Sequence, residues 1–138
     1  MTIDEAQDQI VSDMASREEW FDKYEYLVEQ GKNLEALDDR FKVEAHVIQG
    51  CQSKVWVCAE CIEGKVQYGA DSDALITRGL IALLLRVLNH KVPEDIVKAD
   101  LYFIQETGLG SHLSPSRANG LVAIVRQMKR WAENCAKK

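Results

Sequence analysis

Apolar residues near the start of the chain recur at the three- and four-residue spacing of an α-helix. Thr2 to Glu5 has the form of a capping box, and the helical spacing continues from there to about Ala15. A second stretch repeats the pattern from Ser16 and stops at Gly31, a residue common just after a helix end. The pattern therefore predicts two amphipathic helices whose apolar and aromatic side chains belong to a hydrophobic core.

The spacing of apolar residues changes to every second position after residue 40. Residues 41–47 alternate apolar with polar side chains, and residues 53–61 and 65–68 are further short runs typical of strands. Gly50 marks a hairpin tip between the first two runs, and Glu63-Gly64 marks a turn between the last two. We therefore expect a three-stranded antiparallel meander, which needs a covering layer of helices.

The remaining sequence returns to helical spacing and supplies that layer. Residues 74–89 are apolar nearly all round, which predicts a buried core helix capped by Ser72 or Asp73. Shorter helical pieces follow, and Ser114-Pro115 is typical of the start of a last helix. The predicted fold class is α+β, with several helices packed on a small three-stranded antiparallel sheet in a single domain of residues 1–138.

Composition and charge limit the classes of binding partner and the cellular compartment that we expect for this protein. Apolar residues make up 46% of the chain and charged residues 28%, as in a folded globular domain. The net charge of -5 argues against nucleic acid and against an anionic membrane surface as partners. The longest apolar run, residues 79–85, is too short to span a bilayer, and the first residues do not resemble a signal peptide. The expected location is therefore the cytoplasm.

The four cysteines, Cys51, Cys58, Cys61 and Cys135, are crowded unevenly along the chain. This spacing and the expected reducing compartment favour free thiols. Cys58 and Cys61 have the spacing of zinc ligands, with Cys51 and His46 nearby, but an odd separation in a strand points them to opposite faces. We therefore expect both to fill strand positions as small apolar side chains, and Cys135 to be incidental.

Cys51 differs from the other cysteines because it occupies an expected turn, after Gly50. A turn buries little, so packing gives no reason for a thiol there, and a reactive sulfur is the alternative. His46, His90 and His112 are isolated in the sequence, and no glycine-rich phosphate loop or other cofactor motif occurs. Cys51 is therefore expected to act without a cofactor.

Three motifs in this order resemble the SufE family, and the resemblance extends over essentially the whole chain. They are Gly50-Cys51-Gln52-Ser53-Lys54-Val55-Trp56, Asp71-Ser72-Asp73-Ala74 followed by Gly79-Leu80, and Ser114-Pro115-Ser116-Arg117-Ala118-Asn119-Gly120-Leu121. The sequence departs from the family pattern at Ala70, where relatives often have glycine, and in the extra thiols of Cys58 and Cys61.

The resemblance implies an α+β fold shared with IscU-type scaffolds and a specific role for Cys51. In that family the matching cysteine accepts sulfur from the persulfide of a SufS-type, pyridoxal-phosphate-dependent cysteine desulfurase, stimulates that enzyme, and passes the sulfur to a SufBCD-type iron–sulfur cluster scaffold. The chain is therefore expected to be an accessory sulfur-transfer protein with a covalent persulfide intermediate rather than a stand-alone enzyme.

The same motifs suggest residues that support the Cys51 loop, with Gly50 and Gln52 flanking the thiol. Arg117, in the first turn of the last helix, is expected either to stabilise the Cys51 thiolate or to tether the loop through its forked donors. Asp73 is expected to cap the core helix and to hold it near the loop rather than to take part in the chemistry.

Several alternatives remain open on the sequence. A CsdE-type acceptor would use the same chemistry with a different desulfurase. In a non-catalytic adaptor Cys51 would be incidental, and in a zinc-binding domain Cys51, Cys58 and Cys61 would be ligands. The sequence does not decide between a monomer and a homodimer.

Overall fold

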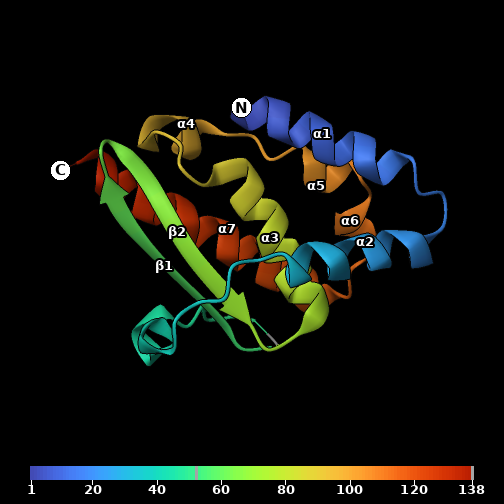
Figure 1. The fold of residues 1–138 in the computed structure, drawn as a ribbon, viewed down its shortest axis with the longest axis horizontal. Helices are drawn as coiled ribbons and strands as arrows, with labels where there is room; N and C mark the ends of the chain where they lie inside the picture. The colour runs from blue at the N-terminus through green and yellow to red at the C-terminus, as the bar shows by residue number, and fades with distance from the viewer. Residues whose placement is uncertain (52, 138) are drawn as a thin grey trace.

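Helices make up most of the chain in the computed structural model, which describes residues 1–51 and 53–137. The α-helices are α1 (Ile3–Ala15), α2 (Trp20–Lys32), α3 (Leu75–Leu88), α4 (Pro93–Lys98), α5 (Phe103–Glu106), α6 (Leu109–His112) and α7 (Pro115–Ala136). Two 3₁₀ turns, η1 (Asp39–Phe41) and η2 (Glu44–His46), precede the strands β1 (Val55–Ile62) and β2 (Lys65–Ser72). Figure 1 shows the two strands along one side of the molecule and the helices beside and behind them. The predicted α+β class is confirmed.

The prediction of three strands is wrong, because the described residues form a two-stranded antiparallel sheet. Residues 41–47 contain the last residue of η1, all of η2 and connecting chain, and only Val47 makes a bridge, to Trp56 of β1. None of the residues in this segment is buried, so its alternating side chains are not covered by a layer of helices. Local contacts close the turns instead: the Asp38 carboxylate accepts a hydrogen bond from the backbone of Arg40.

One face of the sheet belongs to the core. Val55, Val57 and Val66 are fully buried there, and Tyr68 donates a hydrogen bond of 2.7 Å from its hydroxyl to the Met128 carbonyl of α7. Ala70 is also buried on this face, where it lies in β2 opposite Val57 rather than in a turn. The sheet is therefore fixed to α7 by apolar packing and by one buried hydrogen bond.

Helix α3 is the buried core helix that its all-round apolar sequence predicts. It contacts α1, α2, α7 and β2, and its residues Leu83, Leu84, Val87 and Leu88 are fully buried. At the chain start, the Thr2 hydroxyl accepts from the backbone of Glu5 while the Glu5 carboxylate accepts from that of Thr2, which confirms the predicted capping box.

The close approach of α2 to α3 depends on Gly79. A Cβ at this position would overlap the Leu27 carbonyl oxygen and lie 2.6 Å from its carbonyl carbon. We expect Gly79→Ala to push the two helices apart and to lower the free energy of unfolding by about 3 kcal/mol, measured by urea denaturation. Gly110→Ala is the matched control, because its Cβ would meet only an ordinary contact at 3.6 Å with Ile104. Equal unfolding midpoints for the two variants would contradict this prediction.

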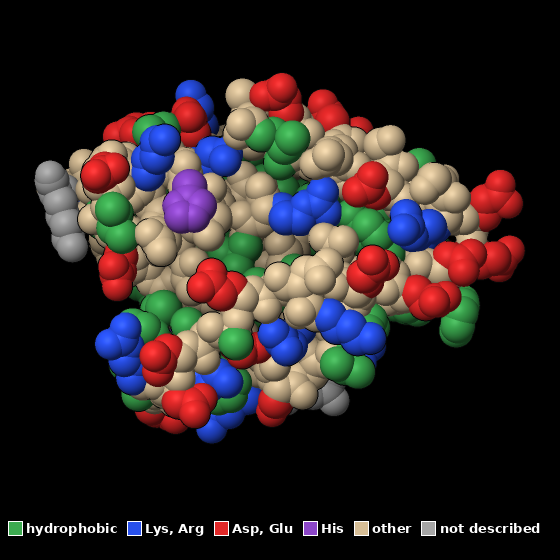
Figure 2. Space-filling model, in the orientation of Figure 1, with side chains coloured by type: hydrophobic (Ala, Val, Ile, Leu, Met, Phe, Trp, Pro, Cys, Tyr) green, Lys and Arg blue, Asp and Glu red, His purple; other side chains and the backbone are tan. Residues whose placement is uncertain are grey.

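The charged side chains on the face drawn in Figure 2 are mixed in sign, with Lys and Arg interspersed among Asp and Glu. Within residues 1–51 and 53–137, no helix combines the length and the apolar character that crossing a bilayer requires.

Candidate functional site

Cys51 lies in the loop that leads into β1 and turns back toward α7. Gly50 has a φ of 93°, a left-handed backbone that favours glycine, and the backbone N–H of Ile48 donates to the Val55 carbonyl across the base of the loop. The Cys51 side chain is half-buried, and its thiol donates to the Gly120 carbonyl of α7, with a distance of 3.7 Å from Sγ to the oxygen. The thiol therefore faces the protein.

A cavity of about 260 Å³ adjoins this thiol, and all three family-like motifs contribute to its wall. Cys51 and Ser53 come from the loop, Thr77 from the first turn of α3, and Arg117 and Gly120 from α7. Residues far apart in the sequence thus meet around one sulfur atom. Sequence reasoning did not assign Ser53, Thr77 or Gly120 to the site, although Ser53 and Gly120 stand within the quoted motifs.

Asp73 holds the chain that leaves the Cys51 loop. Its carboxylate accepts from the backbone N–H of Lys54 at 3.1 Å, and its own N–H donates to the Lys54 carbonyl at 3.3 Å. The Ser72 hydroxyl donates to the same carbonyl at 2.8 Å. The prediction that one of these two residues is the N-cap of α3 is wrong: the N-cap is Ala74, because the Asp73 carboxylate is engaged by Lys54 instead.

Arg117 lies beside Cys51, as one wall of the cavity. Its backbone N–H donates to the Ser114 hydroxyl, which is the N-cap predicted for α7. Its guanidinium makes no hydrogen bond or ion pair with any other residue whose position the structure describes. Gln52, the remaining candidate, lies outside the described residues.

Burial raises the pKa of the Cys51 thiol above its ordinary value. The direction is opposite to the one that thiolate stabilisation by Arg117 would produce. The resting site therefore holds a protonated, sheltered thiol.

Alkylation of Cys51 should accordingly require a higher pH than alkylation of an unfolded cysteine. We expect the pH midpoint of iodoacetamide labelling in folded Cys58→Ser protein to lie above that of the same protein in urea, since burial disfavours the thiolate. The native state keeps the thiol proton longer, so the same shift removes stability as pH rises from the unfolded toward the folded pKa. Mass spectrometry gives the labelled fraction at each pH. A folded midpoint below the unfolded one would refute this account.

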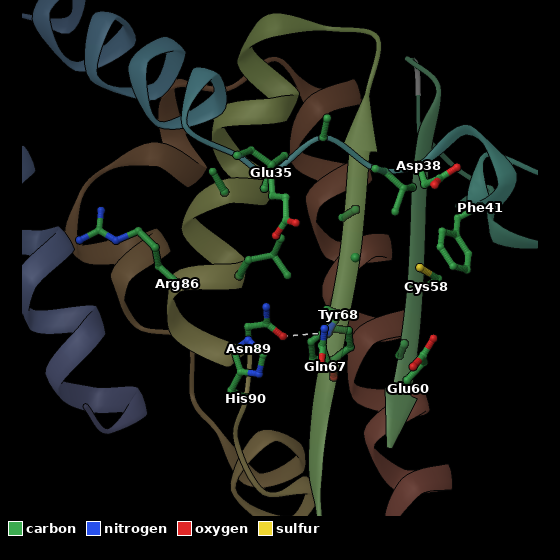
Figure 3. A pocket seen from close by; sticks show the side chains of 18 of the residues that line it. Glu35, Asp38, Phe41, Cys58, Glu60, Gln67, Tyr68, Arg86, Asn89 and His90 are labelled. Carbon is green, nitrogen blue, oxygen red and sulfur yellow. Dashed lines mark hydrogen bonds between the residues drawn. The ribbon is translucent and has the colours of Figure 1, made fainter. Parts of the chain in front are cut away.

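The outer face of the sheet borders a second, larger groove of about 740 Å³, between the α2–η1 segment, the sheet and α3. Figure 3 shows Cys58 and Glu60 of β1 along this groove, together with Arg86 and Asn89 from the α3 side. The prediction that Cys58 and Cys61 point to opposite faces is confirmed, because Cys61 faces α7.

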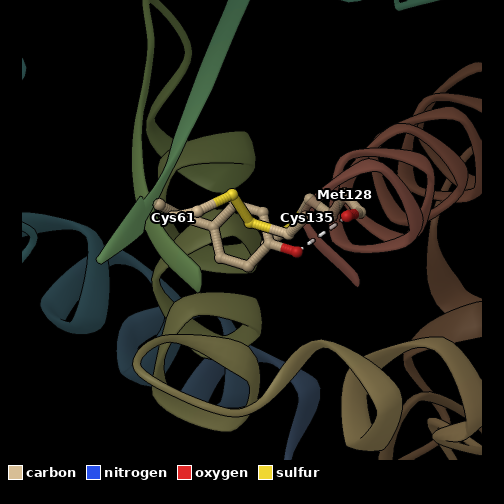
Figure 4. The surroundings of a disulfide bond; sticks show 4 residues. Cys61, Met128 and Cys135 are labelled. Atoms are coloured by element: carbon tan, nitrogen blue, oxygen red, sulfur yellow. Dashed lines mark hydrogen bonds between the residues drawn. A yellow bond between two sulfur atoms is a disulfide. The ribbon is translucent and has the colours of Figure 1, made fainter. Parts of the chain in front are cut away.

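Cys61 and Cys135 form a disulfide, so the prediction of four free thiols is wrong. The register of β1 places Cys61 on the core face, where the last turn of α7 brings Cys135 to a Cα separation of 5.8 Å (Figure 4). Cys135 is therefore not incidental. The free thiols are those of Cys51 and Cys58.

The three cysteines that the zinc-binding alternative requires as ligands lie apart in the structure. No three or more His, Cys, Asp or Glu residues in the part of the chain that the structure describes gather as metal ligands do. Cys51, Cys58 and Cys61 are separated because the first lies in the loop by α7, the second on the outer face of the sheet and the third in a disulfide.

The three histidines lie away from the thiol and have structural contacts of their own. His46 makes a ring hydrogen bond of 2.6 Å with the Phe41 carbonyl, His112 stacks on Trp20, and the backbone N–H of His90 donates to the Val66 carbonyl. None of the three lines the Cys51 cavity.

Comparisons with known proteins point to one family. The sequence profile of SufE, described as an Fe-S metabolism associated domain, matches residues 8–132. The chain is 44% identical over 107 residues to an uncharacterized SufE-like protein of Synechocystis sp., which covers 78% of this chain and 67% of that protein. It is 37% identical over 131 residues to an uncharacterized SufE-like protein of Rhizobium meliloti, covering 91% and 94%.

Among solved structures, the solution structure of a hypothetical protein from Thermus thermophilus is similar. Its TM-score is 0.80 at 20% sequence identity, and the match covers 96% of this chain and 97% of that one. At this identity the similarity extends to the fold alone.

Proposed function

Because this chain belongs to the SufE family of Fe-S metabolism associated domains, we propose that it is a sulfur acceptor that carries persulfide sulfur on Cys51. The observation that supports this most strongly is a free thiol on a loop beside a cavity of about 260 Å³. The loop gives a partner access to the sulfur, and the cavity gives the acquired sulfur a sheltered place.

The transfer is a thiol exchange that needs no external oxidant. The Cys51 thiolate attacks the outer sulfur of the donor cysteine's persulfide and forms a new S–S bond. The bond between that sulfur and the donor Sγ breaks, and the donor leaves as a thiolate. The proton of Cys51 is lost before attack, so the net change is the movement of one sulfur atom to Cys51.

The raised pKa of Cys51 supports an activation step that takes place when the donor binds. A protonated thiol is a poor nucleophile, so the resting protein is protected from alkylation and oxidation. Docking on a desulfurase moves the loop into the partner's site, where deprotonation takes place. Gly50 supplies the freedom for this motion, while the contacts of Asp73 with Lys54 hold the base of the loop.

The proposed partners follow from this chemistry. A SufS-type, pyridoxal-phosphate-dependent cysteine desulfurase supplies the persulfide, and a SufBCD-type scaffold receives the sulfur. A CsdE-type pairing with a different desulfurase is the alternative, and comparing stimulation of the two desulfurases by the same protein separates them.

Direct detection of the persulfide tests the proposal. The protein is incubated with a cysteine desulfurase and cysteine, alkylated, and analysed by intact mass and peptide mapping. We expect one added sulfur on Cys51 in the wild type and in Cys58→Ser, which removes the only other thiol among the described residues. Sulfur found on Cys58 alone, or on neither cysteine, would overturn the assignment.

A further inference from the structure

The cavity beside Cys51 has apolar walls and, besides Ser116 and Arg117, a pair of hydroxyls in its lining. Leu80, Leu121 and Ile124 give it apolar walls, whereas the hydroxyls of Ser53 and Thr77 lie 3.3 Å apart and are hydrogen-bonded to each other. Thr77 is only 8% exposed. A pair of hydroxyls is therefore presented to a space that is otherwise mostly hydrophobic.

The two hydroxyls together have one hydrogen-bond donor that their mutual bond does not use. Each hydroxyl carries one hydrogen, and the bond between them uses one of the two. Neither side chain has another hydrogen-bond partner among the residues that the structure describes. Thr77 is buried and Ser53 is half-buried, so the unused hydrogen is available to an acceptor in the cavity.

We propose that the Ser53–Thr77 hydroxyl pair binds the outer sulfur of the Cys51 persulfide and stabilises it as an anion. This inference rests on the function proposed above. A persulfide is a stronger acid than the parent thiol, so its outer sulfur is anionic at neutral pH. A negative charge in an apolar cavity is costly unless donors face it, and the pair supplies such a donor.

The resting thiol does not use the hydroxyl pair. Cys51 Sγ already donates its hydrogen to the Gly120 carbonyl. The outer sulfur lies one S–S bond, about 2 Å, beyond Sγ, and the cavity of about 260 Å³ has room for it. The hydroxyl pair is thus expected to distinguish the loaded state from the empty one.

Arg117 is the other group that can favour an anion at this place. It is the single charged side chain lining the cavity within the described part of the chain; the loop and α3 contribute no titratable side chain except Cys51. Substituting the hydroxyls without touching Arg117 separates the two contributions.

The pH profile of persulfide alkylation tests the proposal. Cys51 is loaded with inorganic polysulfide in a Cys58→Ser background, and alkylation of the outer sulfur is followed by mass spectrometry across pH. We expect Ser53→Ala/Thr77→Val to raise the midpoint of the loaded protein by about one pH unit, since it loses the hydrogen bond to the anion. Thr77→Ser keeps the hydroxyl and should retain the wild-type midpoint.

The unloaded protein provides the control for a merely structural effect. Without sulfur, the alkylation midpoint of the Cys51 thiol should stay the same in all variants, because its own hydrogen bond goes to the Gly120 backbone. A loaded midpoint that is unchanged in the double variant would overturn the proposal, and so would equal shifts of the loaded and unloaded midpoints. Ser53→Ala/Thr77→Ala also removes both hydroxyls and gives the same decision if the first double variant does not fold.

Chemical loading also keeps this test separate from the proposed function. Polysulfide delivers sulfur without a desulfurase, so the hydroxyl site is decided whether or not an enzyme transfers sulfur to Cys51. The wild type could take no sulfur from a desulfurase while the loaded double variant still shows the raised midpoint. In that case the carrier role would be contradicted and the hydroxyl site would be supported.

Discussion

Cys51→Ser is expected to reduce both sulfur uptake and stimulation of the desulfurase to background. A serine hydroxyl cannot form a persulfide, and no other thiol lines the cavity within the described residues. The loop position and the similar size of serine leave the fold intact, with a change in unfolding free energy within about 0.5 kcal/mol. The rate of alanine formation from cysteine, with and without the variant, measures the effect.

Cys58→Ser is the matched control for this experiment. Cys58 is the other free thiol, it is half-buried, and it faces the groove on the opposite side of the sheet. We expect this variant to stimulate the desulfurase fully. Full stimulation by a well-folded Cys51→Ser protein would instead support an adaptor role that needs no sulfur transfer.

Loss of the Cys61–Cys135 disulfide is expected to lower the free energy of unfolding by about 4 kcal/mol. The bridge closes a loop with a sequence separation of 74, and a longer loop restricts the unfolded chain more. Urea denaturation of the wild type with and without a dithiol reductant, and of Cys61→Ser/Cys135→Ser, measures the difference. The double variant should not respond to the reductant, whereas equal midpoints for oxidised and reduced wild type would contradict the prediction.

Sulfur uptake should survive loss of this disulfide. Cys135 lies at the C-terminal end of α7, whereas Arg117 and Gly120 line the Cys51 cavity near the start of that helix. Figure 1 shows the length of α7 between its two ends. Persulfide formation on Cys51 in the double variant, at a temperature where it is folded, checks this separation of stability from function.

Local sequence signals predicted the helices well because their causes lie within a few residues. The capping box of Thr2 and Glu5, the Ser114-Pro115 start of α7 and the all-round apolar α3 each appear in the structure as expected. Helix α2 ends at Lys32, one residue beyond the predicted stop. The turn at Gly50 was predictable for the same reason, since its positive φ favours glycine.

The first predicted strand failed because alternation alone does not supply a partner. Residues 41–47 alternate as a half-buried strand does, yet a strand also needs a neighbouring edge and a layer to cover it. Only Val47 finds an edge, opposite Trp56, and the preceding residues close into 3₁₀ turns. Cys61 and Cys135 were misjudged likewise, because their pairing depends on how β1 packs against α7.

Local sequence information was enough to specify the helices, the fold class, the turn at Gly50 and the motif that carries Cys51. Each of these depends on neighbouring residues or on motifs that can be compared directly. Three further features arise only when the core is packed: the thiol turns inward to Gly120, Thr77 of α3 shares its cavity, and Cys61 reaches Cys135. Such contacts join residues that are distant in the chain, and they form only when the whole core packs. A local sequence pattern therefore cannot predict them.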